Sequence, residues 1–281
     1  MNHFDELSRI TDDLMNIDKY SFEYYQKPKA KSPKKSDITK IIEDMMALLF
    51  PTFFYNGSSS DFDHHSSIEE LYEKIREQVT IALAFHEIFD IDVGEMAYSI
   101  LAKLPTVKKM LIKDATATYE GDPAAISVAE VIMCYPGFFA IAVYRLAHVF
   151  YLLGIPYIPR MMTEIAHERT GIDIHAGATI GEYFCIDHGT GIVIGETAII
   201  GERVKMYQGV TIGAKSFEVG IEGNPIKGIK RHPNIGNGCV IYANATILGA
   251  NTNIGDNSVI GGNVWLTHSV PPESRIYYDK K

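Results

Sequence analysis

An aliphatic residue recurs at nearly every sixth position between residues 174 and 266. A first run keeps a single phase, with one alanine as its small substitute, and consists of Ile174, Ile180, Ile186, Ile192, Ala198, Val204 and Val210. A second run consists of Ile235, Ile241, Ile247, Ile254, Ile260 and Leu266. Neither a helix, with a period of about 3.6 residues, nor an alternating strand, with a period of about 2, produces this spacing. The pattern therefore predicts a parallel β-helix, in which each short strand turns one aliphatic side chain inward.

Two features interrupt the repeat. Seven residues separate Ile247 from Ile254, which is the one irregular step and predicts a one-residue bulge in one coil. The repeat stops between Gly213 and Asn234, so a loop is expected to protrude over residues 214–234, and a loop of this length usually serves binding. About four complete coils bury too little apolar surface alone, so contacts between the solenoids of several copies are expected.

The residues before the repeat follow a helical period. A capping-box arrangement of Ser67 and Glu70 predicts a helix start, followed by an apolar face made of Ile68, Leu71, Ile75, Val79 and Ala82. A second helix is predicted from Val93 to Leu104, where Pro105 ends it, and a third runs to about Lys113.

The boundaries of the helical part are also predicted. The lysine-rich segment Lys27–Lys35 indicates a solvated linker after a short N-terminal helix. A turn is expected at Asp122-Pro123, followed by a helix pair that ends near Thr170. The sequence thus predicts an α+β chain, with an α-helical domain over residues 1–170 and a β-helical catalytic domain over residues 171–281.

Composition narrows the class of protein. A formal net charge of −9 argues against a general affinity for nucleic acid or an anionic membrane. The three cysteines form no CxxC pair and are typical of buried thiols in a reducing cytosol. No secretory leader is evident, and the apolar segment Gly137–Ile158 carries Arg145 and His148 near its middle. Because an arginine in lipid costs at least about 3 kcal/mol, this segment is expected to be buried in protein, and the protein to be cytoplasmic.

Four polar clusters could carry chemistry in a groove between neighbouring solenoids. They are Asp122-Pro123-Ala124, Asp173-Ile174-His175, Asp187-His188 and Lys230-Arg231-His232. A neutral imidazole can take a proton from a hydroxyl near neutral pH, and a carboxylate can orient the ring. His188 and Asp173 lie less than one coil apart and are expected to meet on adjacent rungs, whereas Asp187 should face the opposite way.

The cationic residues of the loop suit an anionic ligand. Arg231 offers a planar fork that matches a carboxylate, and residues 226–232 hold three fixed cations and no acid. For His175 a structural role and a catalytic role both remain open.

A series of motifs resembles the serine O-acetyltransferases. They are Asp122-Pro123-Ala124, Tyr144-Arg145-Leu146-Ala147-His148 and the strings GIDIHAGATIG, DHGTGIVIGETAIIG, VTIGAK, KRHPNIG, ANATILGAN and SVPP. The resemblance covers residues 115–272, and the patterns DIHxxAxIG, DHxTGIVIGE and RHPxI separate this family from other hexapeptide-repeat proteins. It implies a left-handed parallel β-helix that assembles into a homotrimer, with two trimers often joined into a hexamer through the helical domains.

The resemblance also implies an activity and a set of residue roles. The activity is transfer of an acetyl group from acetyl-CoA to the hydroxyl of L-serine, in cysteine biosynthesis. The implied roles are general base for His188, orientation of that base for Asp173, binding of the serine ammonium for Asp122 and Asp187, binding of its carboxylate for Arg231 and His232, and binding of acetyl-CoA for Gly213, Ala214, Ala243 and Asn244. Neither a metal ion nor an enzyme nucleophile is expected, because the thioester is already activated for direct attack in a ternary complex.

Two segments depart from the family pattern. The loop over residues 214–230 is much longer than in most members, and it is expected to cover the pantetheine arm of acetyl-CoA or to pack on a neighbouring chain. The chain ends in Lys280-Lys281 rather than in the isoleucine that docks into cysteine synthase, so a complex with that enzyme is not expected. Inhibition by L-cysteine at the serine site is usual in the family. Closure of the C-terminal segment contributes to this inhibition, so the short segment of this chain affects how strong an inhibition is expected.

Three other functions are compatible with parts of the sequence pattern. Another hexapeptide acyltransferase, acting on a sugar, an antibiotic or another acceptor, would share His188 and acetyl-CoA but would not need Asp122, Arg231 and His232 together. A γ-class carbonic anhydrase would need a closely spaced histidine pair, which the solenoid lacks. A catalytically inactive scaffold would be unaffected by replacement of His188.

Overall fold

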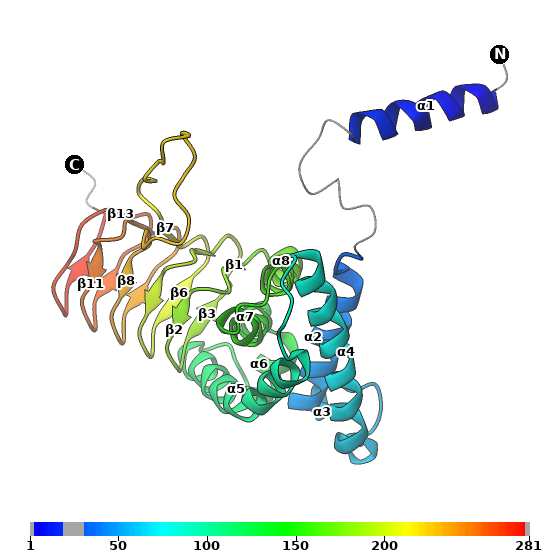
Figure 1. The fold of residues 1–281 in the computed structure, drawn as a ribbon. Helices are drawn as coiled ribbons and strands as arrows, with labels where there is room; N and C mark the ends of the chain where they lie inside the picture. The colour runs from blue at the N-terminus through cyan, green and yellow to red at the C-terminus, as the bar shows by residue number, and fades with distance from the viewer. Residues whose placement is uncertain (1–2, 19–30, 279–281) are drawn as a thin grey trace.

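The computed structural model describes residues 3–18 and 31–278 and has the predicted fold class (Figure 1). Helices form the N-terminal part, and a left-handed parallel β-helix forms the rest, with one long loop projecting from it. The last helix ends at Thr170 and the first strand begins at Asp173. The assignment of residues 1–170 and 171–281 to two separate domains stays a prediction.

The helices of the described residues are α1 (His3–Asp18), α2 (Lys35–Leu49), α3 (Pro51–Phe54), a 3-10 turn (Ser59–Asp61), α4 (His64–Phe85), α5 (Val93–Gly121), α6 (Val128–Cys134), α7 (Pro136–Leu152) and α8 (Ile158–Thr170). Apart from α1, the α-helices pack around one apolar core. Helix α7 packs against both α5 and α8, and α2 packs against α4 and α8. Ile42, Met45, Ile75 and Leu111 are fully buried between these helices. Helix α1 is the predicted short N-terminal helix, and its apolar residues such as Leu7 are exposed.

The solenoid has three parallel sheets that form the sides of a prism. Sheet A contains β1 (Asp173–Ile174), β4 (Val193–Ile194), β7 (Thr211–Gly213), β10 (Thr246–Leu248) and β13 (Trp265–Leu266). Sheet B contains β2 (Thr179–Ile180), β5 (Ile199–Ile200), β8 (Asn234–Ile235) and β11 (Asn253–Ile254). Sheet C contains β3 (Cys185–Asp187), β6 (Lys205–Tyr207), β9 (Val240–Ile241), β12 (Val259–Ile260) and β14 (Arg275–Ile276). These strands make four complete coils and part of a fifth in the described chain.

The strand register corrects one prediction and confirms another. The first aliphatic run was predicted to keep one phase from Ile174 onward. The structure contradicts this, because Ile194, and not Ile192, lies opposite Ile174 in sheet A, so the strand position is two residues later than the six-residue repeat predicts. Ile192 is also fully buried, two residues before the inward residue of its strand, and this second buried position hid the shift. The predicted bulge is present, because Ile254 pairs with Ile235 nineteen residues earlier, whereas paired residues of β4 and β7 are eighteen residues apart.

Helix α4 begins earlier than the capping-box pattern predicted. The Asp63 carboxylate accepts hydrogen bonds from the backbone N–H groups of His65 at 3.0 Å and Ser66 at 3.2 Å, and so caps the helix. The predicted start at Ser67 is therefore wrong, because Asp63, an equally good capping residue, lies four positions upstream and begins the helix there. Ile68 is correspondingly exposed rather than buried.

Helix α5 runs through Pro105 without a break, so the predicted helix end there is wrong. Proline removes one backbone hydrogen bond and crowds the preceding turn. Leu101, Leu104 and Val107 are buried on both sides of it, and their packing holds the helix together. The continuous helix carries Asp122, its C-terminal capping residue, to the solenoid.

The segments around the helices differ in detail from the prediction. The turn at Asp122-Pro123 is confirmed, but three helices rather than a pair follow it. Residues 27–30 of the predicted linker lie outside the described residues, and Lys35 already begins α2. Cys185 and Cys239 are buried as predicted, whereas Cys134 is exposed, and all three thiols are free.

A buried ion pair docks the helices on the first coil. Arg145 of α7 donates to the Asp114 carboxylate of α5, at 2.9 Å from Nη2 to Oδ1, and also to the backbone carbonyl groups of Ile180 at 3.2 Å and Gly181 at 2.7 Å. The same Oδ1 accepts from the backbone N–H of Phe184 at 2.9 Å.

In the described part of the chain no single helix is long and apolar enough to cross a membrane, and α6 and α7 meet that criterion only together, across a bend of 77°.

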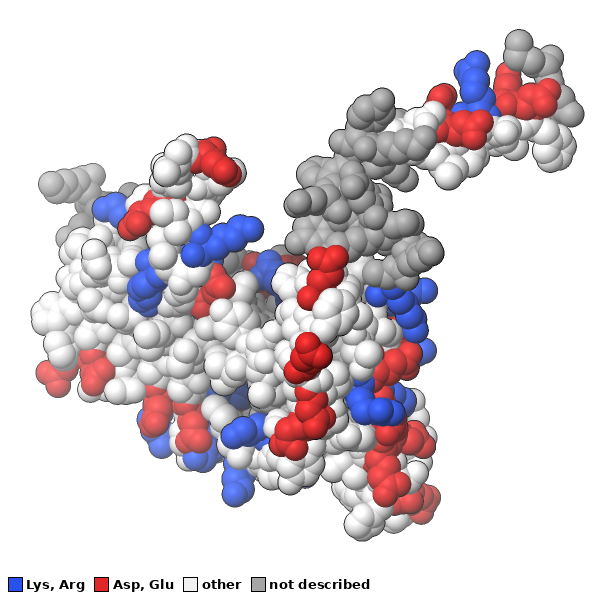
Figure 2. All heavy atoms as spheres, viewed as in Figure 1, with Lys and Arg blue, Asp and Glu red and all other residues white. Residues whose placement is uncertain are grey.

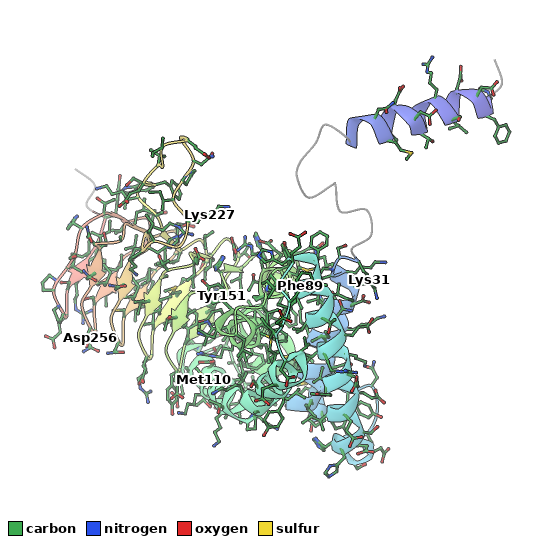
Figure 3. The ribbon with its side chains drawn as sticks, in the orientation of Figure 1. Lys31, Phe89, Met110, Tyr151, Lys227 and Asp256 are labelled. Atoms are coloured by element: carbon green, nitrogen blue, oxygen red, sulfur yellow. The ribbon has the colours of Figure 1, made fainter. Side chains whose placement is uncertain are left out.

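The predicted protruding loop is present between β7 and β8. It projects away from the solenoid beside sheet A (Figure 1), and an antiparallel bridge between Val219 and Pro225 closes it into a hairpin. Phe217, Val219 and Ile221 are exposed on it. Basic side chains lie near its base (Figure 2), and Lys227 among them is labelled in Figure 3.

Candidate functional site

The expected site residues gather on two edges of the prism. The C–A edge consists of the segments that lead from sheet C to sheet A, at residues 188–192, 208–210, 242–245 and 261–264. The A–B edge consists of the segments that lead from sheet A to sheet B, at residues 175–178, 195–198, 214–233 and 249–252. Sheet A lies between the two edges.

Asp122 has a fixed position beside the C–A edge. Its carboxylate accepts from the backbone N–H of Ala124 at 2.8 Å and from the Tyr135 hydroxyl at 2.7 Å. The Tyr135 hydrogen bond holds the pKa of Asp122 below its usual value, and the same bond raises the pKa of Tyr135 to about 12. Asp122 therefore stays ionised at neutral pH and can bind a cation.

Lys205 joins this part of the helical region to the solenoid. Its ammonium lies 2.9 Å from Oδ2 of Asp187 and donates to the backbone carbonyl of Gly121 at 2.6 Å. It also lies 4.5 Å from the centre of the Tyr207 ring. Burial disfavours the ammonium, but the hydrogen bonds to Tyr207 and Asp187 outweigh it and raise the pKa of Lys205.

His188 occupies an unusual backbone conformation at the start of the C–A edge. Its φ of 59° lies in the left-handed region, as do those of Asn244 and Asn263 at later corners of the same edge. The imidazole is largely exposed, and its Nε2 lies 3.7 Å from Oδ1 of Asp187. The expectation that Asp187 faces the opposite way is wrong, because the left-handed residue ends the strand alternation.

Asp173 is not within ion-pair distance of His188 in the described residues. Its carboxylate lies 3.7 Å from Nη1 of Arg160 on α8. The side-chain atoms of Asp173, Glu164 and His167 that could coordinate a metal ion also lie within 4.8 Å of one another. Arg160 also pairs with Glu164, so its guanidinium places a positive charge beside these three side chains. The orienting role of Asp173 stays a prediction.

The A–B edge carries Arg231 and His232 on the returning arm of the long loop. Arg231 donates from Nη2 to Oε2 of Glu196 at 2.6 Å, and Tyr151 of α7, labelled in Figure 3, donates to Oε1 of the same carboxylate at 3.2 Å. The Thr197 hydroxyl oxygen accepts from the backbone N–H groups of Arg231 at 3.0 Å and His232 at 3.2 Å. The second coil thus fixes both residues through Glu196 and Thr197.

His232 is neutral and its tautomer is determined. Its Nδ1 accepts from the backbone N–H of Thr197 at 3.0 Å, so the ring proton resides on Nε2. Burial lowers the pKa of His232 to about 4, and the charges of Arg231 and Lys230 contribute. A Cβ at Gly195 would lie 2.0 Å from Nε2, so this ring position requires glycine there. His175 on the same edge also has a pKa lowered by burial, and its Nδ1 accepts from the Gly177 N–H at 3.0 Å.

The residues expected to bind acetyl-CoA divide between the same two edges. Gly213 ends β7 and Ala214 begins the A–B segment that leads to Arg231, whereas Ala243 and Asn244 lie on the C–A edge, two coils beyond His188. A single chain therefore brings together neither the expected serine-binding residues nor the expected cofactor-binding residues. In each of these two sets, some residues lie at the C–A edge and the others lie at the A–B edge.

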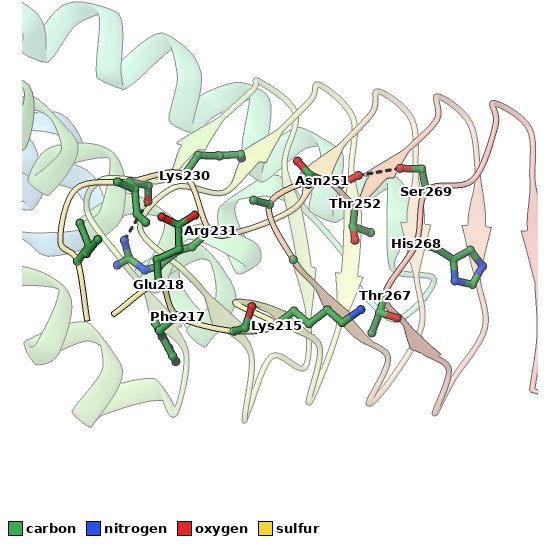
Figure 4. A pocket seen from close by; sticks show the side chains of 15 residues that line it. Lys215, Phe217, Glu218, Lys230, Arg231, Asn251, Thr252, Thr267, His268 and Ser269 are labelled. Atoms are coloured by element: carbon green, nitrogen blue, oxygen red, sulfur yellow. Dashed lines mark hydrogen bonds between the residues drawn. The ribbon is translucent and has the colours of Figure 1, made fainter. Parts of the chain in front are cut away.

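A pocket of about 480 Å³ lies between the long loop and the A–B edge of the last coils (Figure 4). Lys215, Lys230 and Arg231 line it, together with Glu218 and His268. Three cations against one carboxylate give it a net positive charge that suits an anionic ligand.

Several residues that contact the expected site residues at the two edges were not predicted from the sequence. They are Tyr135, Lys205, Glu196, Thr197 and Tyr151. Only Lys205 and Glu196 carried a signal, since each is a charged residue in or next to a solenoid strand. Tyr135 lies between α6 and α7 and Tyr151 lies on α7, and the approach of these helices to the solenoid has no local sequence pattern.

Comparison with known proteins finds similarity along most of the chain. The plasmid serine acetyltransferase of Synechococcus elongatus is 44% identical over 259 residues, which cover 87% of this chain and 81% of that protein. The solved structure of Entamoeba histolytica serine acetyltransferase 1 in complex with L-cysteine has a TM-score of 0.76 and 38% identity, covering 88% of each chain. Neisseria gonorrhoeae serine acetyltransferase in complex with serine has a TM-score of 0.59 and 28% identity, covering 85% of this chain and 93% of that one. No family model matches the chain.

Proposed function

The chain belongs to the serine acetyltransferase family, and from this we propose that it acetylates the L-serine hydroxyl in a site formed by the C–A edge of one copy and the A–B edge of another. One observation carries the proposal of a shared site. Serine-binding and cofactor-binding residues are divided in the same way, with Asp122, Asp187 and His188 at one edge and Arg231 and His232 at the other. A cyclic homo-oligomer such as a trimer repeats the contact between the two edges at each interface.

Each group of serine has a complementary partner. Asp122 and Asp187 are carboxylates suited to the ammonium, and the pKa of Asp122 is lowered by Tyr135. Arg231 uses two of its guanidinium nitrogens in contacts with Glu196 and the Ile229 carbonyl, which leaves N–H donors for the serine carboxylate. The Nε2–H group of His232 is a further donor.

The chemical step is direct acetyl transfer. His188 accepts the proton of the serine hydroxyl while its oxygen attacks the thioester carbonyl. A new C–O bond forms, the C–S bond breaks, and the imidazolium returns the proton to the leaving thiolate of coenzyme A. Asp173 holds Nδ1 of His188 once the second copy and the substrates are in place.

A covalent acetyl-enzyme is the less favoured route. Cys185 lies two residues from Asp187, but burial raises the pKa of its thiol to about 11. The thiol therefore supplies almost no thiolate at neutral pH. The wild-type reaction should accordingly need both substrates bound together.

Acetyl-CoA lies along the same two edges in this proposal. Gly213 and Ala214 approach it from one copy, and Ala243 and Asn244 approach it from the other. The pocket beneath the long loop, with Lys215 and Lys230, is proposed to receive its phosphate groups. The exposed Phe217 on that loop would cover the bound molecule.

L-cysteine is proposed as a competitor of serine. It carries the same ammonium and carboxylate groups, and a relative in this fold is described in complex with it. Its thiol would replace the serine hydroxyl beside His188. The last residues of the chain, 279–281, lie outside the described residues, so the predicted absence of a cysteine synthase complex stays a prediction.

The release of free thiol from acetyl-CoA tests the proposed function. Purified protein is supplied with L-serine, with other amino acids, with a sugar acceptor or with no acceptor. Serine-dependent release supports the proposal, and inhibition by L-cysteine that serine overcomes supports a common site. Release with another acceptor only would contradict the substrate, and no release with any acceptor would favour an inactive scaffold.

A further inference from the structure

Lys205 connects the two carboxylates that the proposed function assigns to the serine ammonium. It pairs with Asp187 at 2.9 Å, and it donates at 2.6 Å to the carbonyl of Gly121, the residue directly before Asp122. Asp187 ends a solenoid strand, whereas Asp122 caps helix α5. Lys205 is therefore the direct link between a carboxylate of the solenoid and the backbone of a carboxylate from the helical part.

We propose that Lys205 is a positioning residue that fixes Asp122 and Asp187 relative to each other and thereby determines the affinity for serine. This rests on the proposed function. The side chain is mostly buried, with 16% of its surface exposed, and Asp187 is exposed to 13%. In such surroundings an ion pair is screened little by solvent, and its geometry is well defined.

The charges of the three groups match a single ammonium ion. Asp122 and Asp187 supply two negative charges and Lys205 supplies one positive charge, which leaves one net negative charge. Lys205 is the cation that pairs with Asp187, and its charge also favours the ionised form of Asp122, so without it both carboxylates would lose a stabilising positive charge. Lys205 thus holds the two carboxylates in a fixed arrangement, and the ammonium of serine neutralises the one remaining negative charge.

Lys205 differs from a lysine that only docks the helices. Lys113 of α5 pairs with Glu182 of the first coil, so it also joins the helical part to the solenoid. Its side chain makes no ion pair with Asp122 or Asp187 among the described residues. Lys113→Met is therefore a matched control, because it removes a docking contact and leaves the two carboxylates intact.

Steady-state kinetics with both substrates test the proposal. In Lys205→Met the KM for L-serine should rise at least about tenfold. The KM for acetyl-CoA should stay within about twofold, because the Lys205 ammonium bonds to Asp187 and Gly121 and to none of the expected cofactor residues. Lys113→Met should change neither KM, and Lys205→Arg should restore most of the serine affinity. An equal rise of both KM values, or the same rise in Lys113→Met, would overturn the proposal in favour of simple docking.

Hydrogen exchange supplies a readout that does not depend on activity. Loss of Lys205 should speed amide exchange in residues 119–127, around Asp122, while the exchange of β9 and β12 stays unchanged. If the wild-type protein does not acetylate serine, the proposed function fails, but this measurement still decides whether Lys205 fixes the segment. Unchanged exchange in residues 119–127 would overturn that role. Lys205→Gln, which keeps a hydrogen-bond donor without the charge, replaces the methionine variant if that variant does not fold.

Discussion

Thr197 determines the tautomer of His232. The backbone N–H of Thr197 donates to Nδ1 of the imidazole at 3.0 Å, and the threonine hydroxyl lies 2.9 Å from the same nitrogen. Because Nδ1 is an acceptor, the neutral ring must carry its proton on Nε2. Arg231, which pairs with the Glu196 carboxylate, therefore has the Nε2–H donor of His232 beside it, and burial lowers the pKa of that imidazole so that it is not a second cation.

The pKa of His232 predicts how stability depends on pH. The folded protein holds the pKa at about 4, against about 6.5 in an unfolded chain, so the unfolded state binds more protons between these values. Stability is therefore lost as the pH falls from 6.5 towards 4, by about 2 kcal/mol at pH 5 from this residue.

Denaturant unfolding at pH 7 and pH 5 measures this contribution. His232→Asn should lose less free energy of unfolding between the two pH values than the wild-type protein, by about 2 kcal/mol. An identical pH dependence in the two proteins would show that His232 titrates normally in the folded state.

Replacement of His188 by alanine tests the general base. Turnover should fall at least about a hundredfold, because the serine hydroxyl loses its proton acceptor. The free energy of unfolding should change little, since the side chain is largely exposed. Thiol release and a denaturant titration check both statements, with His65→Ala on α4 as a control for loss of an exposed histidine away from the site. Near-normal turnover would remove His188 from this role.

Replacement of Arg231 by alanine tests the serine carboxylate site. Loss of a charge-assisted hydrogen bond worth about 2 kcal/mol should raise the KM for serine roughly 30-fold. The KM for acetyl-CoA should rise much less. Equal effects on both substrates, measured in the same thiol assay, would assign Arg231 to the cofactor instead.

The buried pair of Asp114 and Arg145 should dominate the docking of the helices on the solenoid. Asp114→Asn leaves the Arg145 charge buried without its partner and should lower the free energy of unfolding by about 3–5 kcal/mol. The double variant Asp114→Leu/Arg145→Met removes both charges and should cost less than the sum of the single variants. A cost below about 1 kcal/mol for Asp114→Asn would mean that solvent reaches the pair.

The β-helix could be predicted from the sequence because its inward positions admit little except aliphatic residues. The shift between Ile186 and Ile194 could not, since the buried Ile192 carries the same kind of side chain as the strand position. Pro105 was misread for a related reason. Local preference argues for a helix end, and only tertiary packing on both sides decides against it.

The sequence suggests which residue types make up the candidate site, but it does not reveal which of them lie together in one chain. His188, Asp187 and Arg231 stand out as polar residues in an apolar repeat, whereas their separation onto two edges follows from the three-sided coil. Lys205 and Tyr135 depend on how α5 and α6 approach the solenoid, and no spacing along the chain encodes that contact. The left-handed backbone of His188, which turns its ring toward Asp187, is likewise visible only in three dimensions.

Mixed oligomers of two inactive variants test the shared site most directly. His188→Ala impairs the C–A edge of a chain, and Arg231→Ala impairs the A–B edge. In a random mixture about a quarter of the interfaces pair two intact edges, so serine acetylation should return well above the level of either variant alone. If the site lay within one chain, no interface would combine His188 with Arg231, and the mixture would stay at the sum of the two variants.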